Sequence, residues 1–122
     1  MRVLVFVLSL CVSAPAAAQV WIPMLKNTPA ERFDDEDLKL FLEAARKTLN
    51  EAPENQPVTW QNPATRHSGE LTVLRSFEWQ GRPCKEVRVR HQADGRKSDN
   101  NSSLCRVDGK WRLVAPSQLK KK

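Results

Sequence analysis

The sequence predicts an α+β fold in which one amphipathic helix packs on an antiparallel β-meander of about four to five strands. Two observations carry this prediction. Apolar residues recur at helical spacing in the first half of the chain, whereas in the second half they alternate with polar residues. All four glycines lie in that second half, 12, 14 and 14 residues apart, and three of them follow Gln80, Asp94 and Asp108 in turn-forming dipeptides. Short turns between consecutive strands produce a meander, and a helix on one face completes a two-layer domain.

Residues 1–18 have the pattern of a cleavable signal peptide. A charged start is followed by an apolar stretch over residues 3–12, and Ala16 and Ala18 flank the expected cut. About ten apolar residues are too few to cross a bilayer, which needs roughly 20. Lipid attachment at Cys11 is not expected, because the bulky Leu10 precedes it. We therefore expect a periplasmic protein that is not an integral membrane protein, with outer-membrane association left open.

We expect four segments along the chain. Residues 1–18 are the signal peptide, and residues 19–27 form an extended N-terminal arm interrupted by Pro23. Residues 28–116 form a single α+β domain, and residues 117–122 form a basic disordered tail.

The predicted helix begins at Asp34 or Asp35 and ends before Pro53. Its apolar stripe consists of Leu38, Phe41, Leu42, Ala45 and Leu49. A shorter helical turn is expected over Thr28–Glu31, which has the pattern of a capping box with proline at the first helical position. The acidic run 34–37 lacks the glycine and distal glutamate of a calcium loop. Because carboxylates in a first turn favour the helix dipole, we expect these residues to be structural.

The second half of the chain predicts strands. One strand is expected from Val58 to Gln61. The apolar residues that alternate in the next two are Leu71, Val73, Phe77 and Trp79, followed by Val87, Val89 and His91. Each set is expected to line one face of its strand. Residues 98–103 are polar and lack alternation, so a floppy loop is expected there.

Removal of the signal peptide leaves two cysteines, Cys84 and Cys105, in an oxidising compartment. An even pair in such a compartment predicts a disulfide. Zinc is the alternative, but two cysteines without C-x-x-C spacing cannot fill a tetrahedral site alone.

Charge divides along the chain. Residues 19–54 carry five basic and eight acidic side chains, a net charge of −3, whereas residues 55–122 carry fourteen and six, a net charge of +8. A basic half can bind nucleic acid, anionic lipid or an acidic polymer. Because the chain is exported, no nucleic-acid partner is expected. The unknown partner is instead an envelope component, such as anionic lipid, lipopolysaccharide or protein.

Arginines are the candidate contacts for that partner, because a guanidinium binds phosphate or carboxylate in two places. If the neighbouring valines face the core, Arg88 and Arg90 face away from it. The candidate contacts are Arg82, Arg88, Arg90, Arg96, Arg106 and Arg112. The alternative is a solvated face on which Glu78 and Glu86 pair with these arginines across strands.

No catalytic motif is present. The sequence lacks G-x-S-x-G, H-E-x-x-H, a P-loop and G-x-G-x-x-G. The two histidines stand alone, His67 in a polar turn and His91 on an apolar strand face. We therefore expect no enzyme activity, no catalytic residue, no metal site and no cofactor.

Five short segments occur in order: Trp60-x-Asn62-Pro63-x-Thr65, Ser68-Gly69-Glu70-Leu71, Cys84-Lys85-Glu86-Val87, Leu104-Cys105-Arg106 and Asp108-Gly109-Lys110-Trp111. Together they resemble the C-terminal domain of the bacterial seventeen-kilodalton surface antigen family. In that domain a helix precedes W-x-N-P-x-T-G, a Cys-Arg-Glu-Phe segment and a final Ala-Cys-Arg with a D-G-x-W hairpin. The resemblance covers roughly residues 38–114. It implies an envelope protein whose module has no assigned chemistry.

The chain departs from the family pattern in two ways. It has no usable lipid-attachment cysteine and no glycine-rich zipper, which typical members carry for membrane association. In addition, Arg66-His67 stands where the family usually has a lone glycine. These departures favour a soluble periplasmic protein over surface display.

Two functional hypotheses remain. The first is a non-catalytic envelope module that binds or scaffolds an envelope component, with an anionic component as one option. The second is a small-ligand-binding periplasmic domain with a helix-over-sheet pocket, with unrecognised enzyme activity left open.

Overall fold

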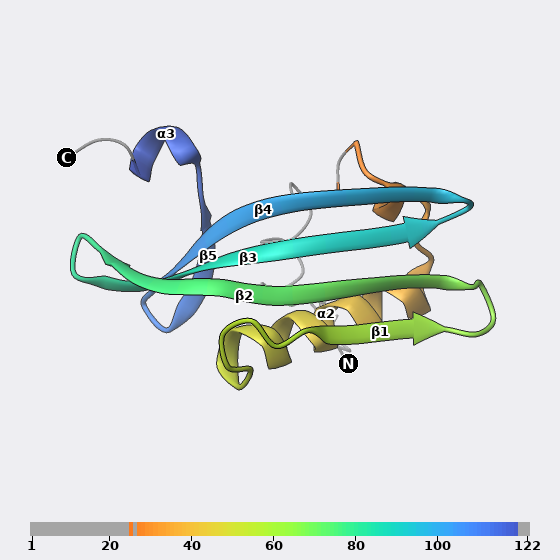
Figure 1. Ribbon diagram of the computed structural model, residues 1–122, viewed down its shortest axis with the longest axis horizontal. Coiled ribbons are helices and arrows are strands. Elements are labelled where there is room, and N and C mark those ends of the chain that lie inside the picture. Colours follow the sequence, from red (N-terminus) through yellow and green to blue (C-terminus); the bar gives the residue numbers. More distant parts are fainter. Residues whose placement is uncertain (1–24, 26, 120–122) are drawn as a thin grey trace, which may run out of the picture.

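The structure, a computed structural model, describes residue 25 and residues 27–119. Along the chain these form η1 (Pro29–Arg32), α2 (Asp35–Asn50), β1 (Val58–Asn62), β2 (His67–Trp79), β3 (Arg82–Ala93), β4 (Arg96–Val107), β5 (Lys110–Val114) and α3 (Pro116–Leu119). The strands form one antiparallel sheet in the order β1-β2-β3-β4-β5 (Figure 1). The α+β class and the five-stranded meander agree with the sequence prediction. The predicted signal peptide, and the predicted arm apart from Leu25 and Asn27, lie outside the described residues.

The start of α2 is fixed by a reciprocal pair of hydrogen bonds. The backbone N–H of Asp37 donates to Asp34 Oδ1 (2.8 Å), and the backbone N–H of Asp34 donates to Asp37 Oδ2 (3.0 Å). This capping box confirms the predicted helix start. Thr28 caps η1 as predicted, but Glu31 accepts its hydrogen bond from the backbone of Asn27 instead of Thr28.

The main core combines side chains of α2 with side chains of the sheet. Its buried apolar members are Phe41, Ala44, Ala45, Leu49, Trp60, Leu71, Val73, Val87, Val89 and Leu104. Leu38 and Leu42, which belong to the predicted stripe, are only partly buried, whereas Asp37 and Thr48 are fully buried. The buried face of α2 is therefore rotated slightly from the prediction. Apolar periodicity could not include these two polar residues, because their burial depends on partners such as the Ala44 carbonyl, which accepts from Thr48 Oγ1 (2.7 Å).

Two-residue turns connect β2 through β5. In the pairs Gln80-Gly81, Asp94-Gly95 and Asp108-Gly109, both residues have positive φ. This is the type I′ conformation, whose twist matches that of the flanking strands. The three turn dipeptides in the sequence therefore predicted the hairpins correctly.

β2 changes face at a β-bulge. The register with β3 shifts after Val73, which inserts one extra residue into the alternation of side chains. Before the bulge, Leu71 and Val73 join the main core. After it, Phe77 and Trp79 pack in a second cluster on the opposite face. The prediction that all four line one face is therefore wrong, because a bulge leaves the alternation in sequence unchanged.

Residues 98–103 belong to β4 and do not form the predicted loop. β4 pairs with β3 along its length, with Asp99 opposite Arg90 and Asn100 opposite Val89. β5 pairs with β4 only from Ser103 onward, so the first half of β4 is an edge. Polar side chains suit an edge strand, because they discourage pairing with another chain. The pairing with β3 and the preceding tight turn produce this strand, without any apolar alternation of its own.

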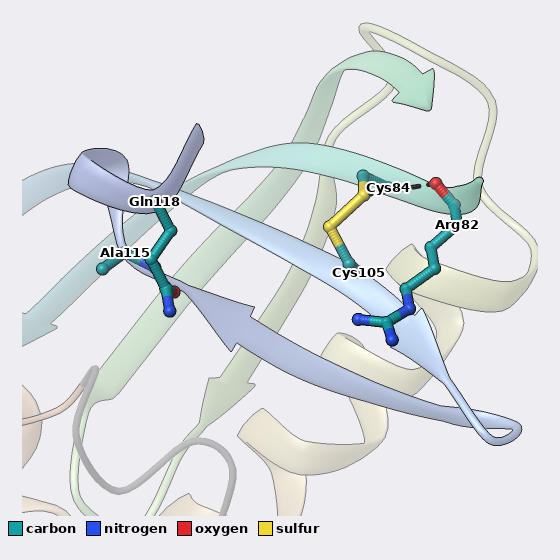
Figure 2. Close-up of a disulfide and its surroundings, with 5 residues drawn as sticks. All are labelled: Arg82, Cys84, Cys105, Ala115 and Gln118. Carbon is teal, nitrogen blue, oxygen red and sulfur yellow. Dashed lines mark hydrogen bonds between the residues drawn. A yellow bond between two sulfur atoms is a disulfide. The ribbon is translucent and has the colours of Figure 1, made fainter. Parts of the chain in front are cut away.

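Cys84 and Cys105 lie opposite each other in β3 and β4 and form a disulfide, as the sequence predicts (Figure 2). Both cysteines are fully buried, under Phe77, Trp79, Val114 and Leu119.

Leu119 belongs to α3, a short helix that includes the first residues of the segment predicted as a tail. The side-chain oxygen of Gln118 accepts from the backbone N–H of Ala115 (3.2 Å) and caps the start of α3 (Figure 2). The structure therefore places residues 117–119 of the predicted tail in a helix, and residues 120–122 lie outside the described residues.

Candidate functional site

The two faces of the sheet carry different side chains. We call the side that carries the main core the core face and the opposite side the outer face. In β3, Val87 and Val89 belong to the main core, so Arg88 and Arg90 project from the outer face, as the alternation predicts.

Arg88 and Arg90 share one carboxylate on the outer face. Arg88 donates to Asp99 through Nε (2.8 Å) and through a terminal guanidinium nitrogen, and Arg90 Nε donates to the same carboxylate (3.3 Å). The hydrogen bond from Arg88 lowers the pKa of Asp99 to about 2. Glu86, one of the glutamates expected to pair with the candidate arginines, instead accepts from Arg75 Nε (2.6 Å). An anion that binds Arg88 or Arg90 must therefore compete with Asp99.

A second group of cations lies at the end of the outer face that carries the disulfide. We call it the basic end: Arg82, Lys110 and Arg112. Arg112 pairs with Cys105, and Lys110 follows in the next outer row, opposite Val107. Arg82, two residues before Cys84, lies beside the disulfide (Figure 2). All three side chains are exposed, and none forms an ion pair with any residue that the structure describes.

The other two candidate arginines lie elsewhere. Arg106 pairs with Trp111 and alternates with the outer-facing Cys105, so it belongs to the core face of β4. Arg96 pairs with Ala93 beside the β3–β4 turn, at the opposite end of the sheet. The six predicted contacts are therefore distributed over both faces and both ends, and only Arg82 and Arg112 combine an outer position with freedom from a carboxylate among the described residues.

A polar groove of about 960 Å³ crosses the outer face from β1 to β4. One row of side chains along it is Gln61, Ser68, Gln92 and Lys97, and the next is Thr59, Glu70, Arg90 and Asp99. Its two acidic and two basic side chains balance. The groove is therefore polar without net charge, in contrast to the basic end.

A buried polar network occupies the other end of the sheet, on the core face. Its centre is the Asp37 carboxylate, which is fully buried at the start of α2. Oδ1 accepts from Asn62 Nδ2 (2.8 Å) and Thr65 Oγ1 (2.8 Å), while Oδ2 accepts from His67 Nδ1 (2.7 Å) and from the Asp34 backbone. Burial raises the pKa of Asp37, but the hydrogen bonds, that of Thr65 foremost, outweigh it and lower the pKa from 3.8 to about 2.

His67 links this network to the β3–β4 turn. Its Nε2 lies 3.0 Å from Asp94 Oδ1, and Asp94 also pairs with Arg32 of η1 (3.8 Å). Hydrogen bonds to Asp94 and then to Asp37 raise the pKa of His67 above its usual 6.5. The side chain is buried at the start of β2, so the prediction of a histidine in a polar turn is wrong.

His91 is a buried histidine of the opposite kind. It lies on the core face as predicted, with its ring 5.5 Å from Phe33 and 5.4 Å from Phe41 between centroids. Burial lowers its pKa from 6.5 to about 4, so His91 is neutral at pH 7. Next to it, the indole of Trp60 lies over Gly69, where an added Cβ would come within 2.3 Å of Trp60 Nε1.

Comparison with known proteins identifies the family. Residues 47–112 match the family model described as 17 kDa outer membrane surface antigen. The chain belongs to this family. No curated protein and no solved structure matches it.

The geometry explains several residues by which the chain resembles the surface antigen family. In the W-x-N-P-x-T segment, the asparagine and threonine are Asn62 and Thr65, the two side-chain donors to Asp37 Oδ1. The glycine that usually follows in the family is replaced by Arg66, whose φ of 62° lies in the left-handed region that favours glycine. Gly69 leaves room for Trp60.

Sequence reasoning missed Asp37 and His67 as partners. One sequence signal pointed to such a network: Asn62 and Thr65 are hydrogen-bonding side chains in a turn, close to His67. Their common acceptor lies 25 and 28 residues earlier in the chain and has no local signature.

Two further findings concern metal binding and membrane-spanning helices. Over residue 25 and residues 27–119, no three or more His, Cys, Asp or Glu side chains are grouped so as to hold a metal ion. Within the same described residues, no helix is long and apolar enough to cross a membrane.

Proposed function

We propose that this member of the surface antigen family is a non-catalytic periplasmic module that binds an anionic envelope component through the basic end of its outer face. Family membership supports association with the envelope. The disulfide fits an exported protein, because such bonds form and persist in oxidising compartments.

The observation that carries the proposal is the set of exposed cations without carboxylate partners among the described residues. Arg82 and Arg112 flank the disulfide from β3 and β5, with only β4 between these strands. Neighbouring strands lie about 4.8 Å apart, so the two arginines are close enough to contact one phosphate-bearing surface. Each guanidinium can bind a phosphate or carboxylate in two places, and neither forms an ion pair with another described residue.

Arg88 and Arg90 are weaker candidates, although the sequence placed them first. An incoming anion would have to displace the carboxylate of Asp99, which holds both side chains. We therefore assign the larger share of binding to the basic end.

Vesicle binding tests the proposal. Vesicles with anionic phospholipid or lipopolysaccharide should bind the wild type at low salt and release it as salt rises, because exposed charges are screened beyond about 8 Å at physiological ionic strength. Arg82→Glu/Arg112→Glu should abolish most of the binding, and Arg88→Glu/Arg90→Glu should weaken it less.

The matched control is Lys39→Glu/Lys47→Glu on the exposed side of α2, which changes the net charge equally. If this control loses as much binding as the basic-end variant, attraction depends on net charge alone and the proposed surface is wrong. Wild type that ignores anionic vesicles even at low salt would also reject it for lipid partners. If Arg82→Glu/Arg112→Glu still binds a ligand in the groove that crosses β1 to β4, the alternative of a small-ligand-binding domain is favoured.

A further inference from the structure

Four segments of the chain converge on the imidazole of His67. Asp37 belongs to α2, and the histidine itself follows the β1–β2 turn. Asp94 belongs to the β3–β4 turn, and it connects in turn to Arg32 of η1. The ring of Phe33, between η1 and α2, lies 5.9 Å from that of His67 between centroids. One titratable side chain therefore joins elements that are distant in sequence.

The hydrogen-bond geometry requires two ring protons. Both ring nitrogens face carboxylate oxygens, at 2.7 Å and 3.0 Å. An ionised carboxylate only accepts, and a neutral imidazole has a single N–H, so only the imidazolium can donate to both partners. The doubly protonated ring is also the form that two adjacent negative charges favour.

The two carboxylates differ in how they respond to loss of a proton. Asp37 is fully buried and held by three further donors, so it cannot turn away from Nδ1. The side chain of Asp94 is 49% exposed and can reach water instead. Deprotonation therefore occurs at Nε2, leaving two lone pairs facing each other between His67 and Asp94.

We propose that His67 is a proton-operated clamp that holds the β3–β4 turn to the N-terminus of α2 and releases that turn when Nε2 loses its proton. The contact with Asp37 persists in both states. Arg32 of η1 then pairs with a carboxylate that His67 no longer holds. The turn carries Gln92 and Lys97 on its flanks, so the clamp acts on one row of the outer groove.

The direction of the pH effect follows from the raised pKa of His67. The clamp is fully engaged below the ordinary histidine pKa of 6.5 and is lost as pH rises through the higher folded-state value. Asp37 does not interfere, since its carboxylate stays ionised until the pH falls towards 2. Two other charged residues lie near His67. Arg32 is paired with Asp94, and Arg66 directly precedes His67 in the sequence.

NMR titration of the two histidines tests the proposal on the intact domain. His67 should titrate above 6.5 and His91 far below it. Asp94→Asn should shift the pKa of His67 downward and leave that of His91 unchanged. Because Asp94 is half exposed, this variant should fold. Asp99→Asn removes the same charge from β4 and is the matched control, which should leave His67 unchanged.

Backbone amide shifts of the β3–β4 turn provide a second readout. They should titrate together with His67 in the wild type and lose that transition in Asp94→Asn. A wild-type His67 that titrates at or below 6.5 would overturn the proposal. So would a turn whose shifts are indifferent to pH, or a His67 pKa that Asp94→Asn does not move.

Discussion

The two ends of the sheet are held together by different chemistry. At one end a disulfide joins β3 to β4 and is buried on the outer face under a small apolar cluster. At the other end, on the core face, a network centred on Asp37 and His67 joins α2 to the turns of two hairpins. One link is covalent and neutral, whereas the other is ionic and depends on protonation.

A small domain can therefore stabilise its two ends through links that respond to different solution conditions. The disulfide end should be sensitive to reductant and indifferent to pH near neutrality. The His67 end should be indifferent to reductant and sensitive to pH. Single and double variants can remove one of these links at a time.

The largest effect is expected from Asp37→Ala at the His67 end. It leaves a buried imidazolium, an asparagine and a threonine without their acceptor, and breaking a buried charge pair costs about 3–5 kcal/mol. Urea unfolding measures the loss. Asp35→Ala, an exposed residue in the same first turn, is the control and should cost far less. Similar losses for the two variants would show that Asp37 acts only through the helix dipole.

Removing the disulfide should lower the free energy of unfolding somewhat less than Asp37→Ala does. Cys84→Ser/Cys105→Ser removes a link between residues 21 apart, and the chain-entropy model gives about 3 kcal/mol for a loop of this size. Urea unfolding of this variant and of reduced wild type should agree. Alkylation of unreduced wild type should add no label, and two labels would refute the bond.

A smaller loss is expected from Gly69→Ala, near the His67 end. The added methyl would lie 2.3 Å from Trp60 Nε1 and 3.0 Å from the Arg90 carbonyl oxygen, and overpacking of this kind costs about 1–3 kcal/mol. Trp60→Phe/Gly69→Ala should recover part of the loss in urea unfolding. A single variant as stable as wild type would mean that the indole moves aside freely.

The smallest effect is expected from Arg66→Gly, which should stabilise the fold slightly instead of destabilising it. A left-handed backbone costs an ordinary residue about 1 kcal/mol, so Arg66→Gly should raise the midpoint of urea unfolding slightly. Asn27→Gly, at another left-handed residue far from the β1–β2 turn in sequence, is a useful comparison. A destabilised Arg66→Gly would show that the arginine side chain contributes more than its backbone costs.

Much of this fold could be predicted because its signals are local. The turn dipeptides ending in Gly81, Gly95 and Gly109 mark the hairpins, and Asp34 marks the start of α2. Local signals failed where pairing decides the structure. Residues 98–103 have no alternation of their own, and they form a strand because β3 lies beside them. The bulge after Val73 leaves no trace in the apolar pattern.

The candidate sites were predictable to different degrees. Alternation was enough to place Arg88 and Arg90 on the outer face, but their shared partner Asp99 lay in the segment expected to be a loop. The pairing of Asp37 with His67 spans 30 residues and depends on the tertiary arrangement of α2 and β2. Only the folded chain brings such residues together, so no local sequence pattern marks the pair.

The free energy of unfolding, measured across pH 6 to 9, tests whether the His67 link depends on protonation independently of the disulfide. Wild type and Cys84→Ser/Cys105→Ser should give parallel curves that fall as the pH rises through the pKa of His67, offset by the contribution of the disulfide. His67→Gln should give a flatter curve, because it removes the group that binds a proton in the folded state. If the slope persists in His67→Gln, or disappears with the disulfide, the two ends are not independent links and the account is wrong.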